Sequence, residues 1–252
     1  MKGKTIFERG GSEMKIHICS SEQAAKQAAE RYVELLRKKP DAVLGFATGS
    51  TPLRLYAELT ARYEAGEVTF TQATSFNLDE YAGLDGAHPQ SYRRFMDEHL
   101  FSKIDIPYER THVPDGADCG ADALAGYEAA IAAAGGVDLQ LLGIGRNGHI
   151  GFNEPGTPFG SVTHVVTLSE STRLANARFF DSPGKVPAQA VSMGIKTVMN
   201  ARAIVLFAQG EIKAQVVREA LRGPVTERVP ASVLQLHPFA EFFLDEEAAK
   251  LL

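Results

Sequence analysis

The sequence contains no tryptophan and only two cysteines, Cys19 and Cys119, among its 252 residues. The two thiols have no C-x-x-C spacing and no neighbouring histidine cluster, which argues against a metal site, and two free thiols suit a reducing compartment. No run of about 18 apolar residues is present, so we expect no transmembrane helix. The first residues lack the apolar core of a signal peptide. These absences predict a cytoplasmic protein that does not enter a membrane.

The sequence also lacks an excess of positive charge, since its formal net charge is -5. A weakly acidic chain has no electrostatic footprint for nucleic acid or for an anionic membrane. A phosphorylated small molecule is still a candidate ligand, because it needs only local positive charge and free N–H groups. Hydrophobic residues make up 44% of the chain, which is enough for a sizeable core.

Residues 1–13 are polar, and Met14 opens a segment that resembles a first strand. We interpret residues 1–13 as a leader, which is an upstream start, a disordered extension or an artificial addition, and leave them out of the fold prediction. No repeat, low-complexity tract or linker divides the rest of the chain. Residues 14–252 are therefore predicted to form a single α/β domain.

Segments with strand character alternate with segments of helical periodicity. Strands are predicted at residues 15–19, 42–47, 74–78, 138–144, 162–168, 202–208 and 241–244. Helices are predicted after Ser21 as N-cap, from Pro52 as first helical residue, at residues 89–101, 121–134 and 170–180, and after Gly210. This alternation predicts an α/β fold with a largely parallel sheet and helices on both faces. In such sheets ligands bind beyond the carboxyl ends of the strands.

Three polar clusters directly follow predicted strands, and the first is the loop Thr48-Gly49-Ser50-Thr51-Pro52. Small side chains let an anion approach the backbone, and the N-terminal amides of the next helix would point at it. An ordinary tight turn with an N-cap explains the same residues. Phosphate binding by Gly49, Ser50 and Thr51 and the plain turn are therefore both open.

The second cluster is the pair of carboxylates Asp79 and Glu80, which follow the predicted strand 74–78. A carboxylate that is partly desolvated at a strand end can have a raised pKa and act as a base at neutral pH. An N-capping aspartate is the simpler interpretation of Asp79 when this segment is considered alone.

The third cluster, residues 143–155, holds four glycines in nine residues together with Asn147, His149 and Glu154. Glycines let the chain turn tightly and pass close to a ligand. A histidine moves protons near neutral pH, and a nearby carboxylate would orient it and raise its basicity. A histidine framed in this way favours a functional role over a structural one.

Arg178 and Lys213 are the remaining candidates. The helix dipole disfavours a cation in the first turn of a helix, where Lys213 is predicted, unless it meets a bound phosphate. A solvated basic residue is the simpler interpretation for each of them alone.

Taken together, these segments resemble the glucosamine-6-phosphate deaminase family. The resembling motifs are FNLDEY at 76–81, HPQSYRRFM at 88–96, GIGRNGHIGFNEP at 143–155, NARFF at 176–180 and LQLHP at 234–238. The resemblance runs from about Met14 to the C-terminus. It implies a modified Rossmann-like fold, no metal or organic cofactor for the chemistry, and conversion of glucosamine 6-phosphate and water to fructose 6-phosphate and ammonia.

The resemblance also implies roles for single residues. Asp79 would be the base that moves a proton between C2 and C1 of the sugar. His149 would assist ring opening, Glu154 would hold His149 in position, and Asn147 would orient His149 without adding charge. The phosphate would meet the backbone of Gly49, Ser50 and Thr51, with charge from Arg178 and Lys213.

Two further expectations concern motion and assembly. Residues 157–187 are a candidate lid over the site. Some larger members of the family are hexamers activated by an N-acetylated sugar phosphate that binds a basic pair, where this chain has His164 and Val166. We therefore expect a monomer or small homo-oligomer without that activation.

Two alternatives stay open at this point. A 6-phosphogluconolactonase would share the fold and a sugar-phosphate substrate but would not need a base at Asp79. A non-catalytic sugar-phosphate sensor would need the phosphate loop but neither Asp79 nor His149, and it would usually carry a DNA-binding segment and a basic face.

Overall fold

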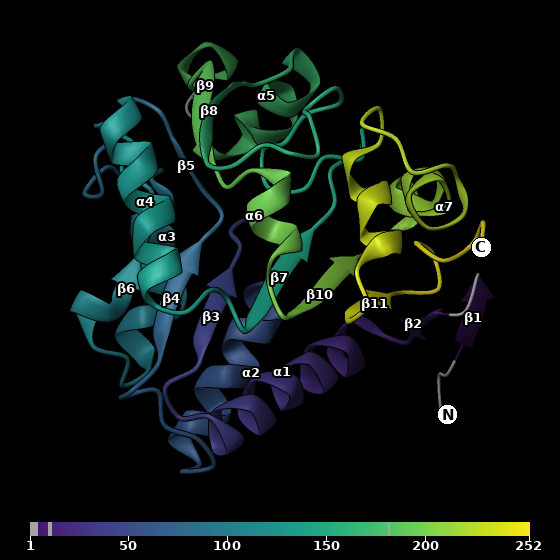
Figure 1. Ribbon diagram of the computed structural model, residues 1–252, viewed down its shortest axis with the longest axis horizontal. Helices are drawn as coiled ribbons and strands as arrows, with labels where there is room; N and C mark the ends of the chain where they lie inside the picture. Colours follow the sequence, from purple (N-terminus) through teal and green to yellow (C-terminus); the bar gives the residue numbers. More distant parts are fainter. Residues whose placement is uncertain (1–4, 10–11, 181) are drawn as a thin grey trace.

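The computed structural model describes residues 5–9, 12–180 and 182–252. Eight strands form one sheet in the order β1-β2-β11-β10-β7-β3-β4-β6 (Figure 1). The strands are β1 (Thr5–Arg9), β2 (Ser12–Ile18), β3 (Val43–Phe46), β4 (Thr74–Asn77), β6 (Thr111–His112), β7 (Leu139–Gly143), β10 (Ala203–Ala208) and β11 (Ala240–Leu244). From β2 to β6 all neighbours are parallel, and β1 pairs antiparallel with β2. The predicted largely parallel sheet is confirmed.

Helices and short 3-10 turns connect these strands. The α-helices are α1 (Ser21–Lys38), α2 (Leu53–Glu64), α3 (Tyr92–His99), α4 (Ala121–Ala133), α5 (Glu170–Asn176), α6 (Ile195–Met199) and α7 (Ala214–Arg222). The 3-10 helices are η1 (Phe101–Lys103), η2 (Tyr108–Arg110), η3 (Ala177–Phe179), η4 (Pro183–Lys185), η5 (Glu211–Lys213) and η6 (Pro230–Leu236). Among the described residues, none of the helices combines the length and apolar composition that crossing a bilayer requires.

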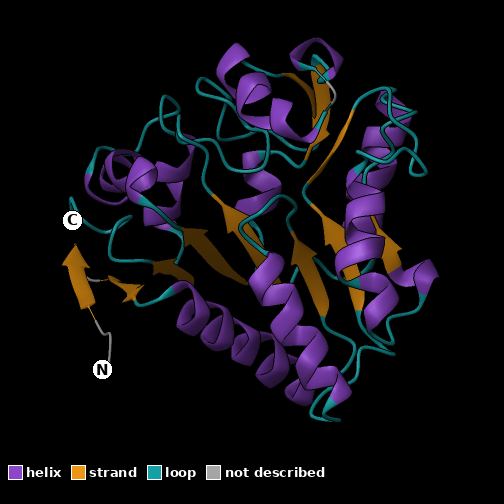
Figure 2. Ribbon diagram, turned by 180° about the vertical axis from the view of Figure 1, so that it is seen from behind, coloured by secondary structure: helices purple, strands orange, loops and turns teal. Residues whose placement is uncertain are grey.

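Helices cover both faces of the sheet, as predicted. Arg31 of α1 donates to Glu241 on β11, whereas Val217 and Leu221 of α7 pack with Phe242, the next residue of the same strand. Because neighbouring strand residues point to opposite faces, α1 and α7 lie on opposite sides of the sheet. Figure 1 shows α4 and α6 in front of the sheet, and Figure 2 shows α1 and α2 in front when the molecule is seen from behind.

The boundaries of several elements differ from the prediction. Ser20, not Ser21, is the N-cap of α1, and its side chain and that of Gln23 form a reciprocal capping box. Pro52 is the N-cap of α2 rather than its first residue. The helix predicted at 89–101 begins at Tyr92, and the one predicted at 170–180 changes to a 3-10 turn after Asn176. β2 begins at Ser12, before the predicted boundary at Met14, and β1 pairs with it.

A second, antiparallel sheet of three short strands lies beyond the carboxyl edge of the large one. Its order is β5-β9-β8, with β5 at Asp79–Tyr81, β9 at Gln189–Ser192 and β8 at His164–Thr167. Ser192 pairs with Asp79 on one side and with His164 on the other. Only β8 was predicted. Asp79 and Glu80 therefore belong to a strand of the small sheet rather than to a loop.

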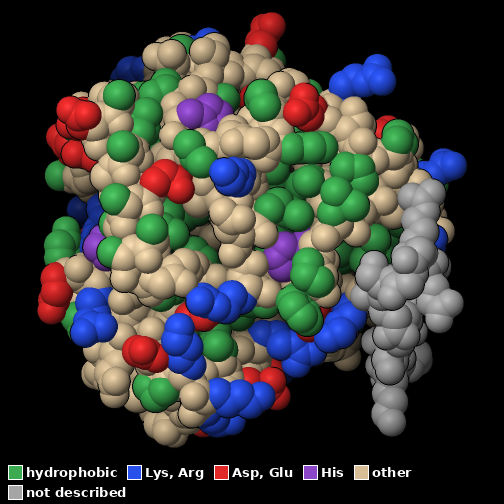
Figure 3. Space-filling view, in the orientation of Figure 1, with side chains coloured by type: hydrophobic (Ala, Val, Ile, Leu, Met, Phe, Trp, Pro, Cys, Tyr) green, Lys and Arg blue, Asp and Glu red, His purple; other side chains and the backbone are tan. Residues whose placement is uncertain are grey.

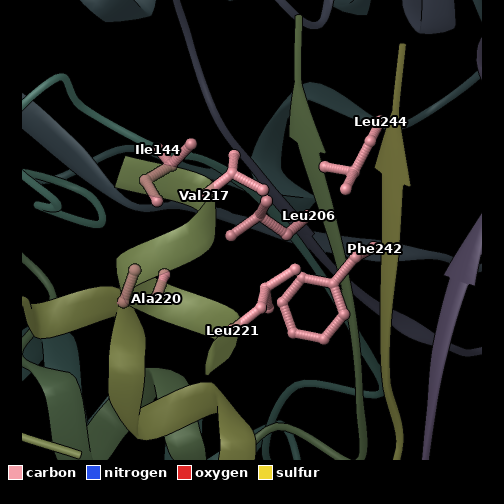
Figure 4. A pocket seen from close by; sticks show the side chains of 8 residues that line it. Ile144, Leu206, Val217, Ala220, Leu221, Phe242 and Leu244 are labelled. Atoms are coloured by element: carbon pink, nitrogen blue, oxygen red, sulfur yellow. The ribbon is translucent and has the colours of Figure 1, made fainter. Parts of the chain in front are cut away.

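A small apolar cavity of ≈ 10 Å³ lies between α7 and the large sheet (Figure 4). Its walls include Val217 and Leu221 of α7 and Leu206 and Phe242 of the strands. Apolar walls offer no partner to a water molecule. This cavity is an imperfection of the core packing and not a ligand site.

The face drawn in Figure 3 carries basic and acidic side chains side by side in its lower half. Mixed charge of this kind does not create the one-sided positive field that attracts nucleic acid.

Candidate functional site

Four segments that contain all the predicted site residues except Arg178 follow the carboxyl ends of four neighbouring parallel strands. Residues 48–52 follow β3, Asp79 follows β4, residues 144–154 follow β7, and Lys213 follows β10. Since β4, β3, β7 and β10 are consecutive in the sheet, these segments lie along one edge. The predicted place of the site is therefore where the structure brings these residues together.

The loop after β3 leads into α2 without a side-chain cap. Gly49 has a φ of 92°, a conformation that residues with a β-carbon rarely adopt. Pro52 offers no side chain that could bond the amides of the first turn of α2. The exposed Ser50 hydroxyl accepts from Arg178 Nη2 at 3.4 Å. The loop thus leaves backbone donors at a helix N-terminus, with a guanidinium beside them.

Asp79 begins β5 and is 6% exposed. Burial, together with the smaller effect of the neighbouring charge of Glu80, raises the pKa of its carboxyl to about 8. Glu80 is buried as well, but its carboxylate accepts from the backbone N–H groups of Tyr81, Tyr92 and Arg93 at 2.8–3.0 Å. Burial raises the pKa of Glu80 to about 7 against the effect of these bonds. Glu80 thus links β5 to α3 through these hydrogen bonds. The carboxyl of Asp79, in contrast, has a pKa close to neutral pH.

The loop after β7 folds back on itself around His149. The Gly145 N–H donates to the His149 carbonyl at 2.9 Å, and the Gly148 N–H donates to the Gly145 carbonyl at 3.1 Å. A β-carbon at Gly145 would lie only 2.4 Å from His149 Nδ1, so the imidazole packs directly on the glycine backbone. Gly148 turns the chain with a φ of 86°. The lack of a side chain at Gly145 leaves room for the imidazole of His149, and Gly148 allows the turn of the chain.

The carboxylate of Glu154 is the acceptor that organises this loop. Its Oε2 accepts from Asn147 Nδ2 at 2.5 Å and lies 3.8 Å from His149 Nδ1, while its Oε1 accepts from the N–H and hydroxyl of Ser169 at 3.2 and 3.1 Å. Burial acts to raise the pKa of Glu154, but the electrostatic contact with His149 and the hydrogen bonds from other groups outweigh it and hold the value at about 2. Glu154 is therefore charged at neutral pH.

Asn147 lies between Glu154 and His149. Its amide nitrogen donates to Glu154, and its Oδ1 accepts from the His149 backbone N–H at 3.3 Å. At 3.8 Å the contact of His149 Nδ1 with Glu154 is electrostatic rather than a hydrogen bond. Asn147 thus fixes the backbone of His149, and Glu154 supplies the negative charge beside the ring.

Asp79 lies against the same loop. A β-carbon at Gly151 would lie 3.5 Å from Asp79 Oδ2 and 3.0 Å from the hydroxyl of Ser192. That hydroxyl accepts from the Phe152 N–H at 3.0 Å. The pairing of β5 with β9 therefore places Asp79 beside the loop that carries His149.

Lys213 also contacts this loop. Its Nζ donates a short hydrogen bond to the carbonyl of Ile144. Burial, together with the smaller effects of the positive charges of Arg146 and Arg178, lowers the pKa of Lys213 to about 8. The structure places Lys213 at the end of η5, just before α7, rather than inside the first α-helical turn as predicted.

Two residues at the site were not singled out in the sequence. Ser169 supports Glu154, and the signal for it was the segment Ser169-Glu-Ser-Thr, which is typical of a helix N-cap. Arg146 stands within the glycine-rich motif, but no pattern in the sequence showed that it lies within reach of Lys213. Among residues 5–9, 12–180 and 182–252, no group of three or more His, Cys, Asp or Glu side chains is arranged to hold a metal ion.

Known proteins of similar sequence and structure belong to the family that the sequence motifs resemble. A family model described as glucosamine-6-phosphate isomerases/6-phosphogluconolactonase matches residues 19–241. A glucosamine-6-phosphate deaminase of Rhodopirellula baltica is 56% identical over 232 residues, which cover 92% of each chain. The solved structure of a monomeric glucosamine-6-phosphate deaminase matches with a TM-score of 0.92 and 44% identity, over 95% of this chain and 100% of that one.

A more distant solved structure shares the fold alone. The 6-phosphogluconolactonase from Trypanosoma cruzi matches with a TM-score of 0.75 and 21% identity, over 98% of this chain and 99% of that one.

The raised pKa of Asp79 predicts a stability that falls with pH. The unfolded carboxyl loses its proton near pH 4, whereas the folded one keeps its proton up to about pH 8, so ionisation favours the unfolded chain across this window. Asp79→Asn removes this effect. We expect the free energy of unfolding of Asp79→Asn, relative to that of the unmodified protein, to rise by on the order of 3 kcal/mol between pH 5 and pH 8.

Urea unfolding of both proteins at pH 5, 6.5 and 8 measures this difference. Asp41→Asn, at an exposed position, is the matched control and should show no such trend. A constant difference between Asp79→Asn and the unmodified protein over the whole range would contradict the placement of Asp79.

Proposed function

The chain belongs to the family of glucosamine-6-phosphate isomerases and 6-phosphogluconolactonases, and from this we propose that it is an isomerising deaminase. It converts glucosamine 6-phosphate and water to fructose 6-phosphate and ammonia, the activity for which its relatives at 56% and 44% identity are named. The observation that carries the proposal is the buried Asp79 carboxyl, with a pKa of about 8, beside the loop that holds His149.

The phosphate of the substrate is assigned to the edge formed by the loop after β3 and the basic side chains. The backbone N–H groups of Gly49, Ser50 and Thr51, just before the start of α2, would bind the phosphate, and Arg178 and Lys213 would supply positive charge. The phosphate is remote from the reacting carbons. Its binding energy can therefore be used to position C1 and C2.

Ring opening is assigned to His149. The sugar is mostly a closed ring, and C2 becomes acidic only once the aldehyde at C1 is free. His149 would take the proton of the anomeric hydroxyl and supply one to the ring oxygen. The charged carboxylate of Glu154, 3.8 Å from Nδ1, would stabilise the protonated imidazole between the two transfers.

The proton shift between the two carbons is assigned to Asp79. Its carboxylate would remove the C2 proton of the open sugar and return it to C1, while a proton passes from the amino group to the C1 oxygen, which leaves an imine at C2. Water adds to that carbon, and the C–N bond breaks to release ammonia and fructose 6-phosphate. A single buried carboxylate suits this step, because few water molecules would compete for the proton while it moves.

A lactonase is the alternative within the family. It would hydrolyse an ester-like bond with activated water and would leave a buried carboxyl at position 79 without a task. The proposal therefore favours the deaminase, and a substrate assay separates the two.

We also propose a moving segment, an oligomeric state and a compartment for this protein. Residues 157–187 would act as a lid, and the contact of Arg178 with Ser50 supports closure over the phosphate edge. The chain would work in the cytoplasm as a monomer or small homo-oligomer. A relative of 44% identity is described as monomeric, which supports the small assembly.

The first test is release of ammonia from glucosamine 6-phosphate by the purified protein in the presence of a chelator. We expect ammonia and fructose 6-phosphate in equal amounts. Hydrolysis of 6-phosphogluconolactone without release of ammonia would assign the chain to the lactonases, and inactivity on both would favour a sensor.

Two variants test the assigned roles. Asp79→Asn should reduce turnover by at least about 10³-fold while binding of fructose 6-phosphate stays within about twofold, since only the base is lost. His149→Gln should slow the closed-ring substrate by about 10²-fold but an open-chain analogue far less. Near-normal turnover by Asp79→Asn would exclude it as the base, and equal slowing of both substrates by His149→Gln would exclude ring opening.

The pH dependence of kcat/KM should be bell-shaped with a maximum near pH 8. Asp79 must lose its proton to act as a base, so activity rises as pH approaches its pKa of about 8. Lys213 must keep its proton to bind phosphate, so activity falls above its pKa of about 8. Lys213→Arg, which stays charged, should shift the alkaline limb to higher pH. An unchanged limb would show that the loss of activity at high pH does not come from Lys213.

A further inference from the structure

Two arginines from separate segments lie within electrostatic reach of Lys213. Lys213 ends η5, Arg178 lies in η3, and Arg146 lies in the loop after β7. The charges of Arg146 and Arg178 both act on Lys213, and both oppose its protonation. These three side chains therefore concentrate positive charge that an anion would neutralise.

Among the described residues, Arg146 differs from several other arginines in its lack of a carboxylate partner. Arg62 and Arg202, for example, pair with carboxylates at 2.7 and 3.0 Å. Arg146 is exposed, and within the described part of the chain its guanidinium has neither a hydrogen bond nor an ion pair. An arginine with no acidic partner, close to two other cations, has its five donors available for an anion.

We propose that Arg146 is a third cation for the phosphate of the substrate and that it links the phosphate to the loop that carries Asn147 and His149. This inference rests on the proposed function. It assigns to Arg146 both recognition of the phosphate and positioning of the acid–base histidine.

The link follows from the order of residues in the loop. Lys213 already holds the loop at the carbonyl of Ile144. Arg146 is two residues further on and directly precedes Asn147, whose side chain bonds both Glu154 and the His149 backbone. A phosphate that contacts Lys213 and Arg146 together would fix this loop at two points. Binding at the remote end of the sugar would then hold His149 against the ring.

The test compares Arg146→Gln with Arg146→Lys. We expect Arg146→Gln to raise KM for glucosamine 6-phosphate and the Kd for inorganic phosphate, each about tenfold, since one charged hydrogen-bonding partner is lost. It should also lower kcat severalfold, since His149 would no longer be held against the ring. Arg146→Lys should restore most of the affinity but not kcat, because an ammonium cannot reproduce the two-pronged contact of a guanidinium.

Arg110→Gln is the matched control. It removes the same charge at an exposed position that bonds the carbonyl of Gln72, just before β6 and so at the opposite edge of the sheet. Its KM and Kd for phosphate should stay within about twofold of the unmodified protein.

The outcomes separate this inference from the proposed function. Unchanged KM and phosphate Kd in Arg146→Gln would overturn the inference while ammonia release still supported the deaminase. A protein that releases no ammonia, but whose phosphate Kd rises about tenfold in Arg146→Gln, would overturn the function and support Arg146 as an anion ligand. A raised KM with unchanged kcat would overturn the positioning role.

Discussion

Parallel pairing of β4, β3, β7 and β10 is the constraint on which the site depends. It brings four carboxyl ends to one edge of the sheet, and each of the four segments that follow contributes a different property. The loop after β3 offers backbone donors, β5 after β4 holds a buried carboxyl, the loop after β7 carries the histidine, and η5 after β10 ends in a lysine. No two of these properties come from the same segment, so the chemistry exists only when the sheet is in register.

Much of this arrangement could be predicted from the sequence. Apolar runs such as 138–144 and 202–208 are typical of strands buried on both faces, and the helical periodicity between strands implies parallel order. Parallel order alone places Gly49, His149 and Lys213 at one edge. The glycines around His149 predicted a site because glycine lets the backbone pass close to another group. The structure uses them in this way, since the imidazole packs on the backbone of Gly145.

The small sheet and the charge balance of the site could not be predicted. β5 has three residues and β9 has four, too few for a period of two to stand out from a loop. The burial of Asp79 depends on β9, which is more than a hundred residues away in sequence. The surroundings of Arg146, whether a carboxylate or another cation, are likewise decided by the packing of distant segments. The N-cap of α1 was predicted one residue too late, at Ser21 instead of Ser20, because two serines stand together.

The place of β11 in the sheet has a consequence for synthesis of the chain. β11, residues 240–244, lies between β10 and β2 and is the parallel neighbour through which the β1–β2 hairpin joins the rest (Figure 1). A growing chain on the ribosome can assemble β3, β4, β7 and β10, but residues 12–18 have no place in the sheet until residues 240–244 have emerged. Closure of the sheet therefore depends on a contact between opposite ends of the chain, which is the slowest kind to form. A chain that stops before β11 would leave the edges of β10 and β2 open to pair with other molecules.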